Sequence, residues 1–175
     1  MMQVRLSGSG GQGLILAGII LAEAAIGDGR EAVQSQSYGP EARGGSSKSE
    51  VIISDGRIHY PKVTAPDLLL AMTQEALNKY GADLKPEGVV ITDTAFVRDV
   101  PPSFKRVYAV PITQLAKEKC GRELFANIVA LGAITRLTGA VTFEALEKAV
   151  LARVPKGTEE MNKLALQVGY QAVSK

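Results

Sequence analysis

Tryptophan is absent from this 175-residue chain, and cysteine and histidine each occur once. The single cysteine, Cys120, excludes an internal disulfide, a zinc site built from several cysteines and an iron–sulfur cluster held by this chain alone. Only 5% of the residues are aromatic, too few for a surface on which single-stranded nucleic acid stacks. Lys and Arg number 20 against 18 Asp and Glu, a net charge of +2, which is too balanced for a dedicated nucleic-acid binder. We expect neither a nucleic-acid partner nor a metal site.

Long hydrophobic runs are missing as well. The most apolar stretch, residues 14–26, is about 13 residues long, whereas a membrane-spanning helix needs ~20. Gly and Ser precede it in place of the positive charges of a signal peptide. We therefore expect a buried helix here, no membrane partner and a cytoplasmic location. With 46% hydrophobic residues the chain can bury a full core, and its length fits one domain over residues 1–175.

The order of the expected elements indicates an α/β fold. Five short runs are typical of strands: residues 3–7, 31–37, 68–72, 89–92 and 106–110. Asp55-Gly56, between residues 48–54 and 57–60, is a strong hairpin signal. Helices are expected over residues 14–26, 73–80, 112–119 and 125–137, and two more begin at Thr142 and Thr158, which cap them. We therefore predict a single three-layer domain with a mixed sheet, a parallel core plus an antiparallel hairpin, and a helical C-terminal part.

A glycine-rich loop, GSGGQG, lies between the first expected strand and the first expected helix. Gly8, Gly10 and Gly13 fit the pattern G-x-G-x-x-G, in which glycines let a ligand approach the backbone and the helix N-terminus offers N–H groups to an anion. A dinucleotide site also needs an acidic residue after the next strand, but that strand runs into residues 34–37, QSQS. This argues against NAD. Three interpretations of the loop stay open. It is a tight turn that needs glycine for packing, a phosphate site, or a contact with the backbone of another chain.

Gly27-Asp28-Gly29 is a second glycine motif. Gly-Asp-Gly begins the magnesium site of thiamine diphosphate enzymes, where an Asn further along the chain completes it. No Asn follows here until Asn78. We therefore interpret this motif as the turn that ends the first helix, with Gly27 as its C-cap.

The most loop-like stretch is SYGPEARGGSS, residues 37–47. Arg43 can bind a carboxylate or phosphate as a planar fork, Glu41 can pair with it, and Tyr38 offers a flat face with a polar tip. This combination is typical of a binding loop. The alternative is an ordinary turn with a surface ion pair.

No catalytic set can be assembled from the remaining residues. His59, on the expected hairpin, has no evident Ser, Cys or carboxylate partner, and Cys120 lies at a helix end. Asn127 begins an apolar helix, where a helix cap or an interface hydrogen bond is as reasonable as a ligand contact. As a free-standing enzyme the chain is underequipped.

The two glycine-rich loops together resemble a known family. A strand ending in GSGGQG, followed about two dozen residues later by SYGPEARGG, resembles the gamma subunit of 2-oxoacid:ferredoxin oxidoreductases. NIVALG at residues 127–132 and the helical C-terminus also fit, so the resemblance covers essentially the whole chain. It implies contacts to cofactor or to other subunits from Gly8, Gly10, Gly11, Gln12 and Gly13, from Tyr38, Gly39, Pro40, Glu41, Arg43, Gly44 and Gly45, and from Asn127.

The resemblance also implies a function. Such enzymes convert a 2-oxoacid and coenzyme A to acyl-CoA, CO2 and reduced ferredoxin, with thiamine diphosphate, magnesium and iron–sulfur clusters as cofactors. In the family, thiamine diphosphate lies between the alpha and beta subunits, and the clusters lie in beta or in a ferredoxin-like delta subunit. This chain is therefore expected to bind no cofactor alone and to support the coenzyme A region of a hetero-oligomer, with ferredoxin as acceptor. A short gamma chain favours 2-oxoglutarate over pyruvate, branched-chain oxoacids and indolepyruvate.

Two other functions remain open. One is a stand-alone nucleotide- or phosphate-binding domain that uses the loop of residues 8–13, which the missing acidic residue disfavours. The other is an assembly scaffold without ligand contact. An Arg43→Ala substitution in the assembled enzyme would separate the scaffold from the subunit that supports coenzyme A, because a scaffold would keep its apparent affinity for coenzyme A.

Overall fold

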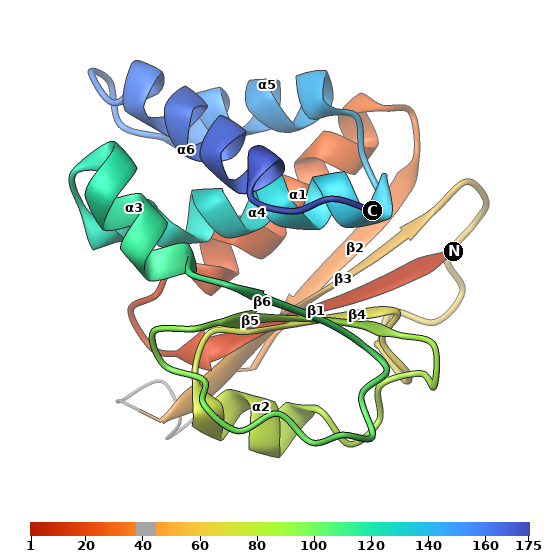
Figure 1. Ribbon diagram of the computed structural model, residues 1–175. Coiled ribbons are helices and arrows are strands. Elements are labelled where there is room, and N and C mark those ends of the chain that lie inside the picture. Colours follow the sequence, from red (N-terminus) through yellow and green to blue (C-terminus); the bar gives the residue numbers. More distant parts are fainter. Residues whose placement is uncertain (38–44) are drawn as a thin grey trace.

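Six strands form one mixed sheet in the computed structural model, which describes residues 1–37 and 45–175 (Figure 1). The strands are β1 (Met2–Ser9), β2 (Glu31–Gln36), β3 (Ser46–Ser54), β4 (Leu68–Ala71), β5 (Val89–Asp93) and β6 (Arg106–Val110). The helices are α1 (Leu14–Gly27), α2 (Gln74–Tyr80), α3 (Ile112–Cys120), α4 (Ala126–Thr138), α5 (Phe143–Arg153) and α6 (Glu159–Gln171), with a short 3-10 turn, η2 (Glu123–Phe125), before α4. The strand order is β2-β3-β1-β4-β5-β6, and the expected α/β fold with a mixed sheet is confirmed.

The antiparallel part of the sheet differs from the expected one. β1, β4, β5 and β6 pair in parallel, whereas β3 pairs antiparallel with both β1 and β2. The prediction of a hairpin at Asp55-Gly56 is wrong. Because β3 already pairs with a strand on each edge, residues 57–60 have no free edge with which to pair. That segment runs outside the sheet, held by a 2.9 Å hydrogen bond from the Ile58 N–H to Glu31 Oε2, and His59 is exposed on it.

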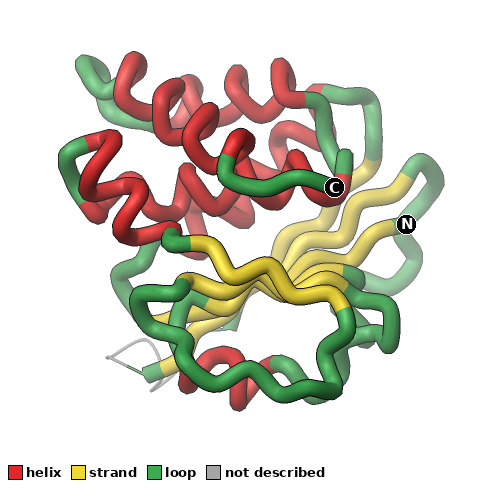
Figure 2. The backbone as a smooth tube through the Cα atoms, in the orientation of Figure 1, coloured by secondary structure: helices red, strands yellow, loops and turns green. Residues whose placement is uncertain are grey.

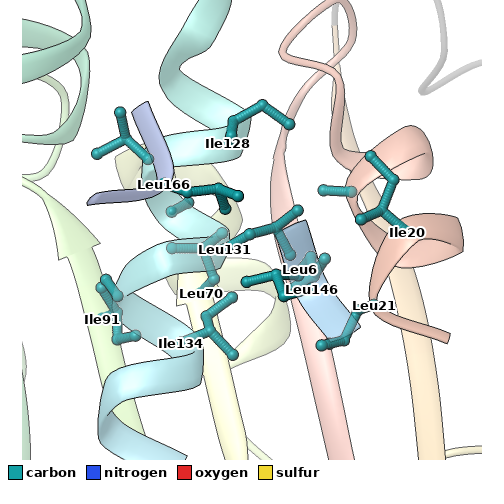
Figure 3. Close-up of a cluster of buried hydrophobic side chains, with 14 of the residues drawn as sticks. Leu6, Ile20, Leu21, Leu70, Ile91, Ile128, Leu131, Ile134, Leu146 and Leu166 are labelled. Carbon is teal, nitrogen blue, oxygen red and sulfur yellow. The ribbon is translucent and has the colours of Figure 1, made fainter. Parts of the chain in front are cut away.

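The larger core lies between the sheet and the helices that cover one of its faces. Leu6, Leu70 and Ile91 project from three parallel strands toward Leu131 and Ile134 of α4 (Figure 3). α1 and α4 pack near the sheet, and α5 and α6 form a further layer outside them (Figures 1 and 2). The apolar α1 is covered by strands on one side and by α5 on another, as expected for a helix without a polar face.

The opposite face of the sheet carries a smaller core under α2 (Figure 2). Leu69 of β4 and Val90 of β5 point to this face and pack with Leu77 of α2. Helices on both faces confirm the expected three layers, and the outer α5–α6 layer is an addition to them.

The predicted cap at Thr142 is confirmed, because its side chain accepts the Ala145 N–H at 3.1 Å at the start of α5. Thr73 was expected as the first residue of α2, but it caps this helix instead and accepts the Ala76 N–H at 3.2 Å. Thr158 precedes α6, but its hydroxyl instead donates to the Pro155 carbonyl oxygen at 2.6 Å. The prediction of a side-chain cap at Thr158 is therefore wrong, because the preceding turn uses that hydroxyl.

The Gly-Asp-Gly motif ends α1, as predicted, although the details differ. The helix runs through Gly27, and the left-handed residue that closes it is Gly29, with φ of 77°. Both carboxylate oxygens of Asp28 accept hydrogen bonds from Thr142, from its N–H and its hydroxyl, each at 2.7 Å. The motif therefore fixes the end of α1 to the start of α5.

α4 and α6 approach each other backbone to backbone. A Cβ added at Gly169 would lie 1.8 Å from the Val129 carbonyl oxygen, and one added at Gly132 would lie 2.2 Å from the Leu166 carbonyl oxygen. No side chain fits at either point, so this crossing requires two glycines, one from each helix. The contact explains the glycine that ends the NIVALG segment.

A buried arginine connects β1 and β3 to the end of α2. Arg5 is 4% exposed, and its Nε donates to Glu50 at 2.8 Å. Its Nη atoms donate to the Asp83 carboxylate and to the Tyr80 carbonyl oxygen. The hydrogen bond from Arg5 holds the pKa of the Asp83 carboxyl below its usual value. The Tyr80 hydroxyl in turn donates to the Ser46 carbonyl oxygen at 3.2 Å, which fixes the first residue of β3.

The two chain ends lie together at the edge of the sheet opposite the glycine loop (Figure 1). β1 begins there at Met2 and runs toward the loop. Lys175 lies beside Gly139, the residue after the last turn of α4, at the far end of that helix from Asn127.

We expect Gly169→Ala to lower the free energy of unfolding by about 1–3 kcal/mol, because the new methyl group overlaps the Val129 carbonyl. The better helix propensity of Ala, worth about 1 kcal/mol, does not offset this overlap. Urea denaturation of the purified chain measures the change. Gly56→Ala is the control, since no atom lies within 4 Å of its added Cβ. Equal stability of Gly169→Ala and wild type would contradict the close crossing.

The Arg5–Asp83 pair predicts a pH-dependent contribution to stability. Because the Asp83 pKa lies lower in the folded chain than the unfolded value of about 3.9, the pair stabilises the fold above that value and loses this effect as the pH falls through the folded pKa. Asp83→Asn should therefore melt below wild type at pH 7, and the difference should narrow below about pH 4. Thermal midpoints across this range test it, with Asp99→Asn as control. A constant difference between Asp83→Asn and wild type would contradict the prediction.

Candidate functional site

The carboxyl ends of the parallel strands meet at one edge of the sheet. There β1 runs into the glycine loop, residues 8–13, and β6 leads into α3. After β1 the chain turns to the face covered by α1, whereas after its neighbour β4 it turns to the opposite face, covered by α2 (Figure 1). Open α/β sheets bind ligands at such switch points. This edge is therefore the candidate site.

Packing accounts for part of the glycine pattern. The Ser9 N–H donates to Gln12 Oε1 at 2.8 Å and closes the loop. A Cβ added at Gly8 would lie 2.2 Å from the same Gln12 atom. Gly13 has a left-handed backbone, with φ of 72°, and its added Cβ would lie 2.5 Å from Asn127 Nδ2. The tight-turn interpretation holds at these two glycines, while Gly10 and Gly11 are exposed at the tip.

Asn127 joins the glycine loop to α4. It is 6% exposed, its Nδ2 donates to the Gly13 carbonyl oxygen at 3.1 Å, and its Oδ1 accepts from the Ile128 N–H at 2.9 Å. It is the second residue of α4 and does not cap the helix. The expected helix cap is therefore wrong, the hydrogen bonds of Asn127 are made within the chain, and the interface or ligand contact stays a prediction.

A groove of about 440 Å³ opens beside the glycine loop. Its other walls come from α1, the segment after β5, α3, η2 and α4, and include Leu16, Phe96, Thr113 and Leu124. Phe96 and Leu124 are large apolar residues left 46% and 66% exposed on the rim. Sequence reasoning missed these residues. Phe96 and Thr113 follow two expected strands closely, a position that could have marked them, whereas Leu124 carried no such signal.

The start of α1 gives the groove a positive end. The first hydrogen bond of the helix runs from the Ala17 N–H to the Gly13 carbonyl oxygen at 3.0 Å, so the three N–H groups before it have no partner within the helix. The first turn holds no acidic residue, although the exposed Glu123 of η2 lines another wall of the groove. Free N–H groups and the helix dipole together favour an anion.

The groove offers binding groups rather than proton-transfer groups. The Thr113 hydroxyl donates to Asp93 Oδ2 at 2.5 Å, and the Asp93 carboxylate also accepts the Thr113 N–H. Asp93 is fully buried and closes the start of α3. Apart from this Thr113–Asp93 pair, which is engaged at the start of α3, no described residue of the groove pairs a nucleophile with a base. The groove is suited to hold and orient a ligand.

The second glycine-rich loop begins and ends at this same edge. Its predicted binding residues Tyr38, Gly39, Pro40, Glu41, Arg43 and Gly44 lie outside the described residues. On one side of them the Ser37 N–H donates to the Lys48 carbonyl oxygen at 3.2 Å. On the other side, after Gly45, Ser46 pairs with Ser9 at the end of β1. The described ends of this loop therefore lie next to the glycine loop.

The remaining candidate residues form neither a catalytic pair nor a metal site with other described residues. Cys120 ends α3, and burial raises the pKa of its thiol, which keeps it protonated at neutral pH. In the described parts of the chain, no three His, Cys, Asp or Glu side chains gather in a way that could hold a metal ion. Nor is any described helix long and apolar enough to cross a membrane.

Comparison with known proteins establishes the family of the chain. The chain matches the family described as pyruvate ferredoxin/flavodoxin oxidoreductase over residues 3–172. The KorC subunit of 2-oxoglutarate synthase from Methanocaldococcus jannaschii is 54% identical over 172 residues, which cover 97% of this chain and 92% of that protein.

Solved structures show the same fold. The gamma subunit of a keto/oxoacid ferredoxin oxidoreductase from Geobacter sulfurreducens has a TM-score of 0.89, 57% identity and 98% coverage of both chains. The PORC subunit of a pyruvate oxidoreductase from Thermotoga maritima has a TM-score of 0.82 and 28% identity, covering 99% of this chain and 97% of that one. The chain therefore belongs to the pyruvate ferredoxin/flavodoxin oxidoreductase family, in which it is a gamma-type subunit.

Proposed function

We propose that this chain serves an enzyme that oxidatively decarboxylates 2-oxoglutarate, and that its glycine-loop groove forms part of the coenzyme A site. The groove carries the proposal, because it offers unpaired N–H groups and exposed backbone, while its Thr113–Asp93 pair is engaged at the start of α3. The choice of 2-oxoglutarate is supported by 54% identity to a 2-oxoglutarate synthase subunit, against 28% to a pyruvate oxidoreductase subunit. A stand-alone nucleotide-binding domain is not favoured, since the similarity to subunits spans the chain.

The residues of the groove fit coenzyme A. Its phosphates suit the N–H groups at the start of α1 and the exposed backbone of Gly10 and Gly11. Its uncharged arm suits the apolar rim of Leu16, Phe96 and Leu124. Gln12, Gly8, Gly13 and Asn127 then act by holding the loop in shape. Tyr38, Gly39, Pro40, Glu41, Arg43, Gly44 and Gly45 would complete the site from the neighbouring loop, with Arg43 as a phosphate or carboxylate ligand.

The remaining cofactors do not fit this chain. Both oxygens of the Asp28 carboxylate are taken by Thr142, so the Gly-Asp-Gly motif is not free to hold the magnesium of thiamine diphosphate. One buried cysteine cannot hold an iron–sulfur cluster. We propose that alpha and beta subunits, with a ferredoxin-like delta subunit, hold these groups, which supply bond cleavage and electron transfer when bound, and that ferredoxin accepts the electrons in the cytoplasm.

Purification from the native host tests this function. The tagged chain should bring with it a thiamine-binding chain and an iron–sulfur chain, identified by mass spectrometry. The complex should reduce a viologen dye when given coenzyme A and 2-oxoglutarate, and more slowly with pyruvate. Preference for pyruvate would overturn the substrate assignment. A clean monomer or homo-oligomer without these partners would overturn the subunit assignment.

Gln12→Glu tests the coenzyme A site in the assembled enzyme. Glu keeps the acceptor for the Ser9 N–H and adds one negative charge beside the groove. We expect the apparent KM for coenzyme A to rise about three- to tenfold, because such a charge near a phosphate costs about 1 kcal/mol. The KM for the 2-oxoacid should not change. Gln167→Glu, the same change on the exposed side of α6, is the control. An unchanged KM for coenzyme A would favour the pure scaffold.

A further inference from the structure

Tyr80, the last residue of α2, is connected to the glycine loop from the other face of the sheet. It is 9% exposed and does not line the glycine-loop groove. Its hydroxyl donates to the Ser46 carbonyl oxygen at 3.2 Å. Its own carbonyl oxygen accepts Arg5 Nη1 at 2.9 Å, and Nζ of Lys48 and of Lys79 lie 5.6 and 5.4 Å from the centre of its ring. Backbone and ring are both held, so the direction of the hydroxyl is fixed.

The Ser46 carbonyl lies at the end of the pairing between β1 and β3. Ser46 is the first residue of β3 and stands opposite Ser9, the last residue of β1. The end of a ladder frays easily, because its outermost residues have neighbours on one side only. The buried Ser46 hydroxyl has no hydrogen-bond partner among the described residues, so it does not hold this end. The Tyr80 hydroxyl holds it instead, from outside both strands.

Ser9 carries this constraint to the groove. Its N–H donates to Gln12 Oε1 at 2.8 Å, the hydrogen bond that closes the glycine loop. Ser9 and Gln12 both line the groove, together with the exposed tip of the loop. Fraying of the Ser9–Ser46 pair would move the Ser9 N–H away from Gln12. Two contacts therefore connect Tyr80 to the groove wall: the pairing of Ser46 with Ser9, and the hydrogen bond from Ser9 to Gln12.

We propose that Tyr80 is a positioning residue for coenzyme A. The inference rests on the function proposed above, because the glycine loop must form part of the coenzyme A site. Through Ser46 and Ser9, the Tyr80 hydroxyl keeps the loop in the shape that presents its backbone to the ligand. A loosened loop must be ordered before it binds, and this ordering weakens binding. Abundant coenzyme A overcomes the loss, so it appears in the KM for coenzyme A and not in kcat.

Tyr80→Phe in the assembled enzyme removes the hydroxyl and keeps the ring. We expect the KM for coenzyme A to rise about three- to tenfold, the size expected for one lost hydrogen bond, with kcat and the KM for the 2-oxoacid unchanged. Tyr170→Phe is the matched control. It removes a hydroxyl that accepts a hydrogen bond from Arg136 at 3.4 Å, on α6 and outside the groove. An unchanged KM for coenzyme A in Tyr80→Phe would overturn the proposal.

A double-mutant cycle tests the route through Gln12. Gln12→Ala removes the acceptor of the Ser9 N–H and should itself raise the KM for coenzyme A. Because Tyr80 acts through this hydrogen bond, Tyr80→Phe should add little to Gln12→Ala. A general loss of stability would instead raise the KM by the same factor in both backgrounds. Effects that multiply in this way would contradict the route.

Hydrogen exchange of the full chain gives a readout that does not depend on coenzyme A. In Tyr80→Phe the amides of residues 9–13 and 46–48 should exchange faster, while those of α4 and α6 keep their wild-type rates. Unchanged exchange at residues 9–13 would overturn the proposal and leave the proposed function standing. Faster exchange there with an unchanged KM for coenzyme A would overturn the positioning role. If Gln12→Glu also leaves that KM unchanged, the coenzyme A site proposed above is wrong as well.

Discussion

The backbone contact between α4 and α6 is the constraint on which the rest of the molecule depends. α4 is buried on nearly every side, against the sheet below and against α6 above. Because Gly132 and Gly169 leave no room for a side chain, the two helices have one separation only. α4 in turn holds the glycine loop, because Asn127 at its start donates to the Gly13 carbonyl oxygen.

A division of labour follows from this arrangement. The glycine-loop groove has a shaped backbone, an unpaired helix start and an apolar rim, features that suit the binding and orientation of a ligand. Two carboxylates that could take part in proton transfer instead accept hydrogen bonds at helix starts, Asp28 at α5 and Asp93 at α3. An enzyme that distributes its chemistry over several chains can use such a subunit to hold one substrate while another chain performs the reaction.

Local signals in the sequence predicted most elements, and long-range pairing explains what they missed. Strand β6 and the Thr142 cap agree with the prediction, because short apolar runs and capping residues act within a few positions. The Asp55-Gly56 hairpin was wrong because both edges of β3 are already paired, one with the preceding strand β2 and the other with the distant strand β1. The glycine loop was predicted, but the meeting of Phe96 and Leu124 beside it depends on tertiary packing that no spacing encodes.

The position of the chain ends has a practical consequence. Met2 and Lys175 both lie across the sheet from the edge that carries the glycine loop (Figure 1). A linker at either end therefore leaves that edge open to solution. The subunit can be tethered to an electrode or a resin through either terminus, in an orientation that presents the glycine-loop edge outward.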